Sequence, residues 1–180
     1  MKTPLLPLSL LLCLPASPAF AADPDARALA RAMRTDEIAV AGAKRAFLAG
    51  AVEDRYGRTP PGCVKKVPWE DYTEGSAKVV ASVLSPQEIR TALGFFQSDA
   101  GTKYVEGLLR RLRASQGKDS TLPEIGGKEE ISPAQVAAIS DFSRSDLGRK
   151  IMGKEMTESP AALAYGRDIM DGIAARCARK

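Results

Sequence analysis

The sequence contains no histidine and few aromatic residues, with one Trp, four Tyr and five Phe in 180 residues. Without imidazole, the chain cannot form a Ser-His-Asp or Cys-His nucleophile or one of the usual His-containing catalytic zinc sites. Runs of five or more basic residues are also lacking, although the formal net charge is +4. Most hydrolase mechanisms are therefore excluded, and nucleic acid is not an expected partner.

The N-terminal residues have the pattern of a secretory signal. Lys2 supplies the positive start, Leu5 to Leu14 is apolar, and Ala19-Phe20-Ala21 has the small-x-small pattern of a cleavage site. The apolar stretch is too short to span a bilayer, and no second one follows. We predict a signal peptide over residues 1–21, cleavage after Ala21, and a periplasmic single α-helical domain over residues 22–180 without a membrane span.

Cysteine is scarce in the mature chain, which retains Cys63 and Cys177. An even pair in an oxidising compartment is typically bonded, so we predict a disulfide between them. Chain-entropy arguments assign such a long loop a stabilisation of about 4–5 kcal/mol. A redox or nucleophilic thiol is the alternative, but it lacks both a C-x-x-C pattern and a histidine.

Long β-branched runs are also scarce, whereas alanine is abundant and apolar residues recur at spacings of three and four. This pattern predicts a compact all-α fold. We expect a long helical region from Asp25 to about Tyr56 with a break near Thr35, and a Pro- and Gly-rich connector over residues 58–68. Residues 69–84 are expected to be helical.

A long C-terminal helix is predicted after Pro160. Apolar residues at alternating spacings of three and four define the face that we expect to be buried, and Cys177 lies on it. These residues are Leu163, Gly166, Met170, Ile173 and Cys177.

The strongest internal signal is a repeat. Residues 84–104 align without gaps on residues 131–151, with seven of 21 positions identical. We predict two related helix-turn-helix units that pack with the long N- and C-terminal helices. The identical pairs are Ser85/Ser132, Pro86/Pro133, Phe95/Phe142, Ser98/Ser145, Asp99/Asp146, Gly101/Gly148 and Lys103/Lys150.

The shared residues are typical of helix starts and corners. Each unit opens with a Ser-Pro pair and has an acidic or amide residue three positions after the serine, which predicts a capping box. A second serine caps the next helix, and the glycine after it permits close helix approach. The predicted caps are Ser85, Glu88 and Ser98 in the first unit and Ser132, Gln135 and Ser145 in the second. We therefore predict no catalytic residue, cofactor or metal site.

The repeat also resembles a known family. Leu-Ser-Pro-x-Glu-Ile followed by Phe-Phe-x-Ser-x-x-Gly, in residues 84–101, is similar to the core motif of a secreted bacterial helical family, domain of unknown function 2059. The resemblance is best over residues 70–110 and weaker over 131–151, where Ser143 replaces the second aromatic residue. It implies a compact periplasmic helical domain, and the family brings no established catalytic residues.

Residues 114–130 are predicted to be a loop between the two units. At about 17 residues it is longer than a usual connection, and long loops are often functional. Its apolar residues can either dock on a partner or fold back onto the protein. The candidate partner-binding residues are Lys118, Leu122, Pro123, Glu124 and Ile125.

Together these observations favour a non-enzymatic periplasmic protein that binds a protein or an envelope component, such as an immunity-type inhibitor or an envelope maintenance factor. Two alternatives stay open. A cell-wall glycan hydrolase can work with carboxylates alone. A lipid or small-ligand carrier requires an apolar cavity between the helix pairs. The candidate carboxylates for the hydrolase are Glu70, Asp71, Glu88, Glu129 and Glu130.

Overall fold

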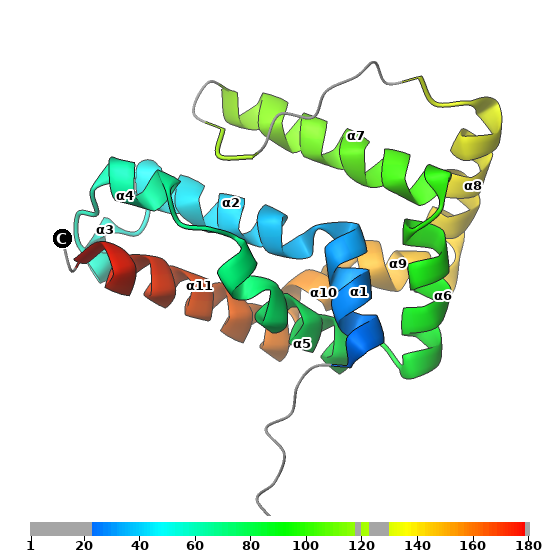
Figure 1. The fold of residues 1–180 in the computed structure, drawn as a ribbon, viewed down its shortest axis with the longest axis horizontal. Helices are drawn as coiled ribbons and strands as arrows, with labels where there is room; N and C mark the ends of the chain where they lie inside the picture. The colour runs from blue at the N-terminus through cyan, green and yellow to red at the C-terminus, as the bar shows by residue number, and fades with distance from the viewer. Residues whose placement is uncertain (1–22, 118–119, 123–129, 179–180) are drawn as a thin grey trace, which may run out of the picture.

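The computed structural model describes residues 23–117, 120–122 and 130–178, and within these ranges it is all-α with no strand (Figure 1). The predicted fold class is therefore confirmed. The helices are α1 (Pro24–Met33), α2 (Thr35–Leu48), α3 (Glu53–Tyr56), α4 (Pro61–Lys65), a 3-10 turn (Glu70–Tyr72), α5 (Thr73–Val83), α6 (Pro86–Phe96), α7 (Asp99–Gln116), α8 (Pro133–Arg144), α9 (Asp146–Met152), α10 (Lys154–Glu158) and α11 (Pro160–Ala178).

The break predicted near Thr35 lies at Arg34, which joins α1 to α2 in the left-handed region at φ 53°. The Arg34 guanidinium donates to both carboxylate oxygens of Glu37, at 2.8 and 2.5 Å. Thr35 does not cap α2, because its hydroxyl donates to the Ala30 carbonyl at 3.2 Å. The break therefore depends on the left-handed backbone of Arg34 and on its ion pair, because no side chain caps the start of α2.

The predicted connector over residues 58–68 contains a helix, so this prediction is partly wrong. Pro61 occupies the first position of α4, where a missing N–H costs nothing. Helix α4 carries Cys63, which is bonded to Cys177 in the last turn of α11 with a Cα–Cα distance of 5.7 Å. The predicted disulfide is confirmed, and it joins the two elements near the C-terminal end of the ribbon in Figure 1.

The C-terminal helix runs over the predicted range, but its buried face is rotated from the predicted one. Ile173 and Cys177 are buried as expected, whereas Leu163 is 52% exposed. Apolar residues also occupy the neighbouring stripe of α11, and this second stripe is buried because α11 packs through it against α2 and α5. The buried stripe consists of Tyr165, Ile169, Ile173 and Cys177.

Two apolar clusters form the core, and α2 and α5 contribute to both. One cluster gathers residues of α1, α5, α6, α7 and α9, including Leu29, Val80 and Ile89. The other joins α2, α4, α5 and α11 and includes Phe47 and Ile173. Because α5 presents Val80 to the first cluster and Val79 to the second, it links the two halves.

The two helix corners use the same bonds. Ser98, between α6 and α7, donates to the Phe95 carbonyl at 2.6 Å and accepts from the Gly101 N–H at 3.2 Å. Between α8 and α9, Ser145 donates to the Phe142 carbonyl at 2.6 Å and accepts from the N–H of the equivalent glycine at 3.0 Å. A Cβ at Gly101 would lie 2.1 Å from the Phe95 carbonyl oxygen, so only glycine fits there.

The first helix of each pair begins with a complete capping box. Ser85 accepts from the Glu88 N–H at 3.3 Å, and the Glu88 carboxylate accepts from the Ser85 N–H at 2.7 Å. Ser132 and Gln135 make the equivalent bonds at 3.2 and 2.8 Å. Each box satisfies N–H groups that a helix start otherwise leaves without a partner.

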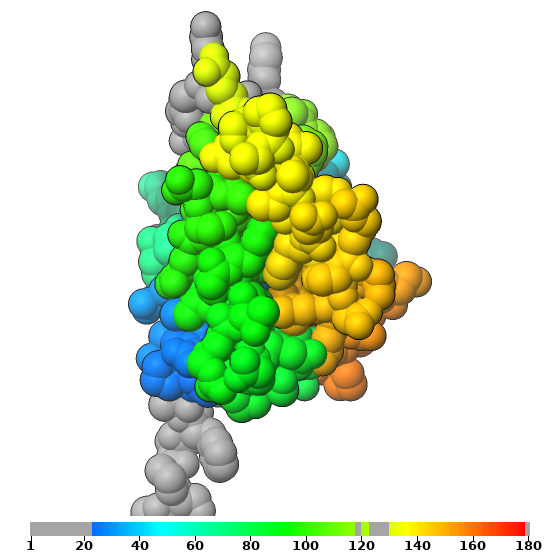
Figure 2. Space-filling model, turned by 90° about the vertical axis from the view of Figure 1, so that its right-hand side faces the viewer, coloured from blue at the N-terminus to red at the C-terminus, as the bar shows by residue number. Residues whose placement is uncertain are grey.

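The two pairs contact each other through an aromatic stack and an ion pair. The rings of Phe95 and Phe142 stack with centroids 3.8 Å apart and planes 4° apart. Lys150 of α9 reaches back to the Glu88 carboxylate of α6 at 3.0 Å. Figure 2 shows α6 and α8–α9 side by side on one face of the molecule. These contacts hold α9 against the first apolar cluster.

Candidate functional site: a cavity between the helices

An apolar cavity of about 480 Å³ lies where α1, α2, α5, α6, α7, α9, α10 and α11 converge. Its inner wall consists of core side chains rather than surface residues. Ligand sites are typically concave, mostly apolar and of this size. The buried residues of the wall are Met33, Ser76, Val79, Val80, Phe96, Val105, Ile151 and Tyr165.

The polar groups in the lining are hydroxyls, and no charged side chain occurs among the described lining residues. Ser76 donates to the Thr73 carbonyl at 2.9 Å. Thr35 and Thr157 likewise donate to carbonyls of their own chain, at 3.2 and 3.4 Å. These three hydroxyl protons are therefore already used within the protein. The lining hydroxyl residues are Thr35, Ser76, Tyr104, Thr157 and Tyr165.

Tyr165 closes the deep end between α5 and α11. Its hydroxyl donates to the Tyr72 carbonyl at 3.1 Å. Gly75 permits this packing, because a Cβ there would lie 2.5 Å from the Tyr165 ring. Burial, and then the negative charge of Asp36, raise the pKa of Tyr165 well above its ordinary range. Tyr165 therefore stays uncharged throughout the physiological pH range.

The mouth of the cavity is formed by α9, α10 and α11. Met152, Thr157 and Gly166 line it and are exposed. Methionine adapts its shape readily to different apolar groups, and Met156 extends this lining inward. A Cβ at Gly166 would meet no atom within 4 Å. The mouth therefore has space beside α11 that a larger side chain could fill.

The helix corners support the cavity wall. Phe96, which lines the cavity, packs edge-on against Phe142 with centroids 5.5 Å apart and against Phe95 at 5.1 Å. The stacked pair Phe95/Phe142 thus lies directly behind this part of the wall. The caps predicted from the sequence do not line the cavity, but they position the helices that do.

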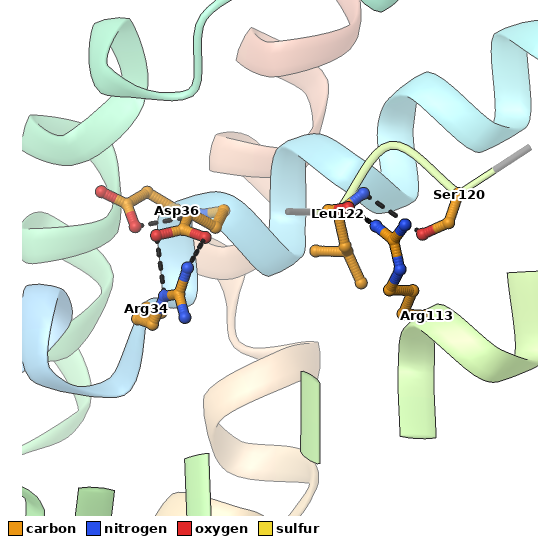
Figure 3. A network of polar contacts seen from close by, with 6 residues as sticks. Arg34, Asp36, Arg113, Ser120 and Leu122 are labelled. Carbon is orange, nitrogen blue, oxygen red and sulfur yellow. Dashed lines mark hydrogen bonds and ion pairs between the residues drawn. The ribbon is translucent and has the colours of Figure 1, made fainter. Parts of the chain in front are cut away.

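The predicted partner-binding loop is shorter than expected, because α7 continues to Gln116. Leu122 is only 3% exposed and packs into the first apolar cluster. As Figure 3 shows, the Arg113 guanidinium donates to the Leu122 carbonyl and Ser120 accepts from the Leu122 N–H. Leu122 therefore folds back onto the protein and is not available to a partner. The other candidates, Lys118, Pro123, Glu124 and Ile125, lie outside the described residues.

Among the candidate carboxylates, Glu88 does not have the environment of a glycosidase acid. A general acid needs a raised pKa, but the Ser85 N–H and then Lys150 lower the pKa of Glu88 to about 2. Asp71 is held by Arg176 at 2.6 Å. Glu129 lies outside the described residues. The geometry therefore assigns Glu88 to a helix cap and an ion pair.

Within the described part of the chain, no group of three or more Asp, Glu or Cys residues is placed to hold a metal ion. None of the described helices is long and apolar enough to cross a membrane.

Comparison with protein-family models, with curated proteins and with solved structures gave no match to this chain.

Sequence reasoning missed the cavity. Each lining residue appears as an ordinary apolar position of a helix, and the lining is drawn from eight helices. One local signal exists in the sequence. Met152 ends α9 and Met156 lies four residues later in α10, a short helix without a buried residue. The sequence does not show that this segment faces a space rather than a filled core.

Proposed function

We propose that this protein is an exported, non-enzymatic binding protein that holds one apolar small molecule in the cavity between its helices. The observation that supports this proposal is a cavity of about 480 Å³ whose described lining has no charged side chain. Filling such a space with a matching ligand removes apolar surface of both partners from water. The proposal includes export by the signal peptide over residues 1–21, function in the periplasm, and kinship with the family that residues 84–101 resemble.

This proposal selects the carrier alternative over a protein partner. The protein-partner hypothesis offered the loop over residues 114–130 as its candidate docking segment, and Leu122, the described apolar residue of that loop, is buried. The hydrolase alternative is disfavoured because the ion pair with Lys150 keeps Glu88 ionised rather than poised to donate a proton.

Fluorescence of diphenylhexatriene, an uncharged hydrocarbon dye, tests the proposal. We expect the purified protein to bind one dye molecule with an increase in emission. Gly166→Phe should weaken binding at least tenfold, because the new ring fills the mouth without meeting another atom at its Cβ.

Gly94→Phe is the matched control. Gly94 is also an exposed helical glycine with no atom within 4 Å of a Cβ, and it does not line the cavity. We expect this variant to bind the dye as the parent protein does. Equal dye binding by Gly166→Phe and the parent, or no binding by the parent, would refute the proposed function.

A further inference from the structure

We propose that the ligand is a single alkyl chain with an uncharged oxygen-containing head group, of the long-chain alcohol class, and that the Tyr104 hydroxyl donates a hydrogen bond to that oxygen. This inference rests on the proposed function and adds to it the ligand class and the residue that selects it.

The volume sets the size of the chain. A cavity of about 480 Å³ has room for roughly 12–16 methylene-sized groups, since each takes up about the 30 Å³ of one water molecule. The buried wall is aliphatic and aromatic, with Val80, Phe96 and Ile151 among its members. This lining suits a flexible hydrocarbon chain.

The deep end does not suit a polar head. The Tyr165 and Ser76 hydroxyls there donate to the carbonyls of Tyr72 and Thr73. A head-group oxygen placed beside them would lose its water without gaining a hydrogen-bond donor in return. The head therefore belongs nearer the solvent.

Tyr104 is the lining hydroxyl with a proton to donate. It is half-buried on α7, and its ring contacts Phe96 with centroids 6.4 Å apart. Within the described part of the chain, its hydroxyl has no hydrogen-bond partner, unlike the other four lining hydroxyls. A buried or half-buried tyrosine usually gives its hydroxyl proton to an acceptor, and a ligand oxygen can be that acceptor.

The charges beside Tyr104 favour a neutral head. Lys103 pairs with Glu106 at 3.4 Å, and Arg110 approaches the same carboxylate at 3.7 Å. Both cations already have a carboxylate partner in Glu106. A carboxylate head would lose part of its hydration in a lining without a charged partner, which costs more than one hydroxyl bond returns.

Displacement of diphenylhexatriene by dodecanol and by dodecanoate, measured above pH 7 so that the acid is ionised, tests this inference. We expect dodecanol to bind the parent protein at least tenfold more tightly than dodecanoate. Tyr104→Phe should weaken dodecanol binding about three- to tenfold, the worth of one hydrogen bond, and leave affinity for the oxygen-free dye unchanged.

Tyr56→Phe is the matched control, because it removes a hydroxyl that donates to Asp171 at 2.8 Å outside the cavity. It should change neither affinity. The inference is overturned if dodecanoate binds as tightly as dodecanol, or if Tyr104→Phe affects dye and dodecanol equally. Either result leaves the proposed function standing, whereas failure of the parent to bind the dye itself refutes the proposed function.

Discussion

The α6–α7 pair and the α8–α9 pair turn the chain with the same bonds, yet they are buried to different extents. In α6, Ile89 is 2% exposed, whereas the equivalent Val136 of α8 is 54% exposed. Phe96 lies in the core and lines the cavity, whereas its equivalent in α8 is Ser143. Helix α8 has no buried residue.

The difference distinguishes features that depend on nearby residues from features that depend on packing. Caps and corners depend on residues three positions apart, so they survive in both pairs despite different surroundings. Burial depends on which apolar side chains occupy a face and on what lies opposite. The α6–α7 pair thus forms core and cavity wall. Helix α8 covers one side of the molecule, while α9 contributes Ile151 to the wall and Met152 to the mouth.

The largest expected effect is at the equivalent positions Ile89 and Val136. Ile89→Ala should lower the free energy of unfolding by about 2–5 kcal/mol, because it opens a void in a filled cluster. Val136→Ala should change it by less than about 0.5 kcal/mol, as for exposed sites in general. Urea unfolding of both variants measures the difference, and equal losses would contradict the assignment of α6 to the core.

A smaller effect is expected at the corner glycines. Gly101→Ala places a Cβ 2.1 Å from a backbone oxygen and should cost about 1–3 kcal/mol. Gly148→Ala creates a similar clash, 1.8 Å from the Phe142 carbonyl oxygen. Helix α8 has no buried residue and can shift away from the new methyl group, so we expect a smaller loss of stability than for Gly101→Ala.

Gly94→Ala is the control for the corner glycines, because no atom lies within 4 Å of its Cβ. It should be neutral or slightly stabilising, since alanine is the better helix former. Thermal unfolding of the three variants ranks them by the stability that each one loses. A loss at Gly148 as large as the loss at Gly101 would show that the two pairs are equally constrained and would contradict this expectation.

The smallest effect is expected at the ion pair that joins the two units. The pKa of Glu88 is lowered from 4.5 to about 2, so the ionised form stabilises the fold. This contribution is complete above about pH 4.5 and is lost as the pH falls towards 2. Glu88→Gln gives α6 the type of cap found at Gln135 and removes the charge that faces Lys150.

Because both partners are about one-third exposed, we expect Glu88→Gln to cost only about 0.5–1 kcal/mol at pH 7. The cost should disappear near pH 2. Urea unfolding across this pH range checks the sign, and a cost that is independent of pH would exclude the ion pair as its cause.

The parts of the fold that the sequence predicted are those with local or compositional causes. The capping boxes at Ser85 and Ser132 depend on residues within one helical turn. The Cys63–Cys177 bond followed from an even pair in an expected oxidising compartment. The helix inside the Pro-rich connector was missed because proline usually marks the end of a helix, whereas Pro61 occupies the first position of α4.

The cavity and the buried charges could not be predicted because both depend on tertiary packing. Lys44 is buried, and burial lowers its pKa while Glu70 opposes the shift. Its ammonium donates to the Lys65 carbonyl at 3.2 Å, a contact between residues 21 positions apart. Likewise, a space bounded by Met33, Tyr104 and Tyr165 exists only once several helices have converged.

The bond between α4 and α11 also determines what a protease can do to this protein. Cys63 and Cys177 are 114 residues apart, so the chain between them is a covalent ring that includes α5 to α10 and most of α11. One cut anywhere in that ring opens it without releasing a fragment. The nicked protein should therefore migrate as one species on a non-reducing gel and separate into two pieces only after reduction.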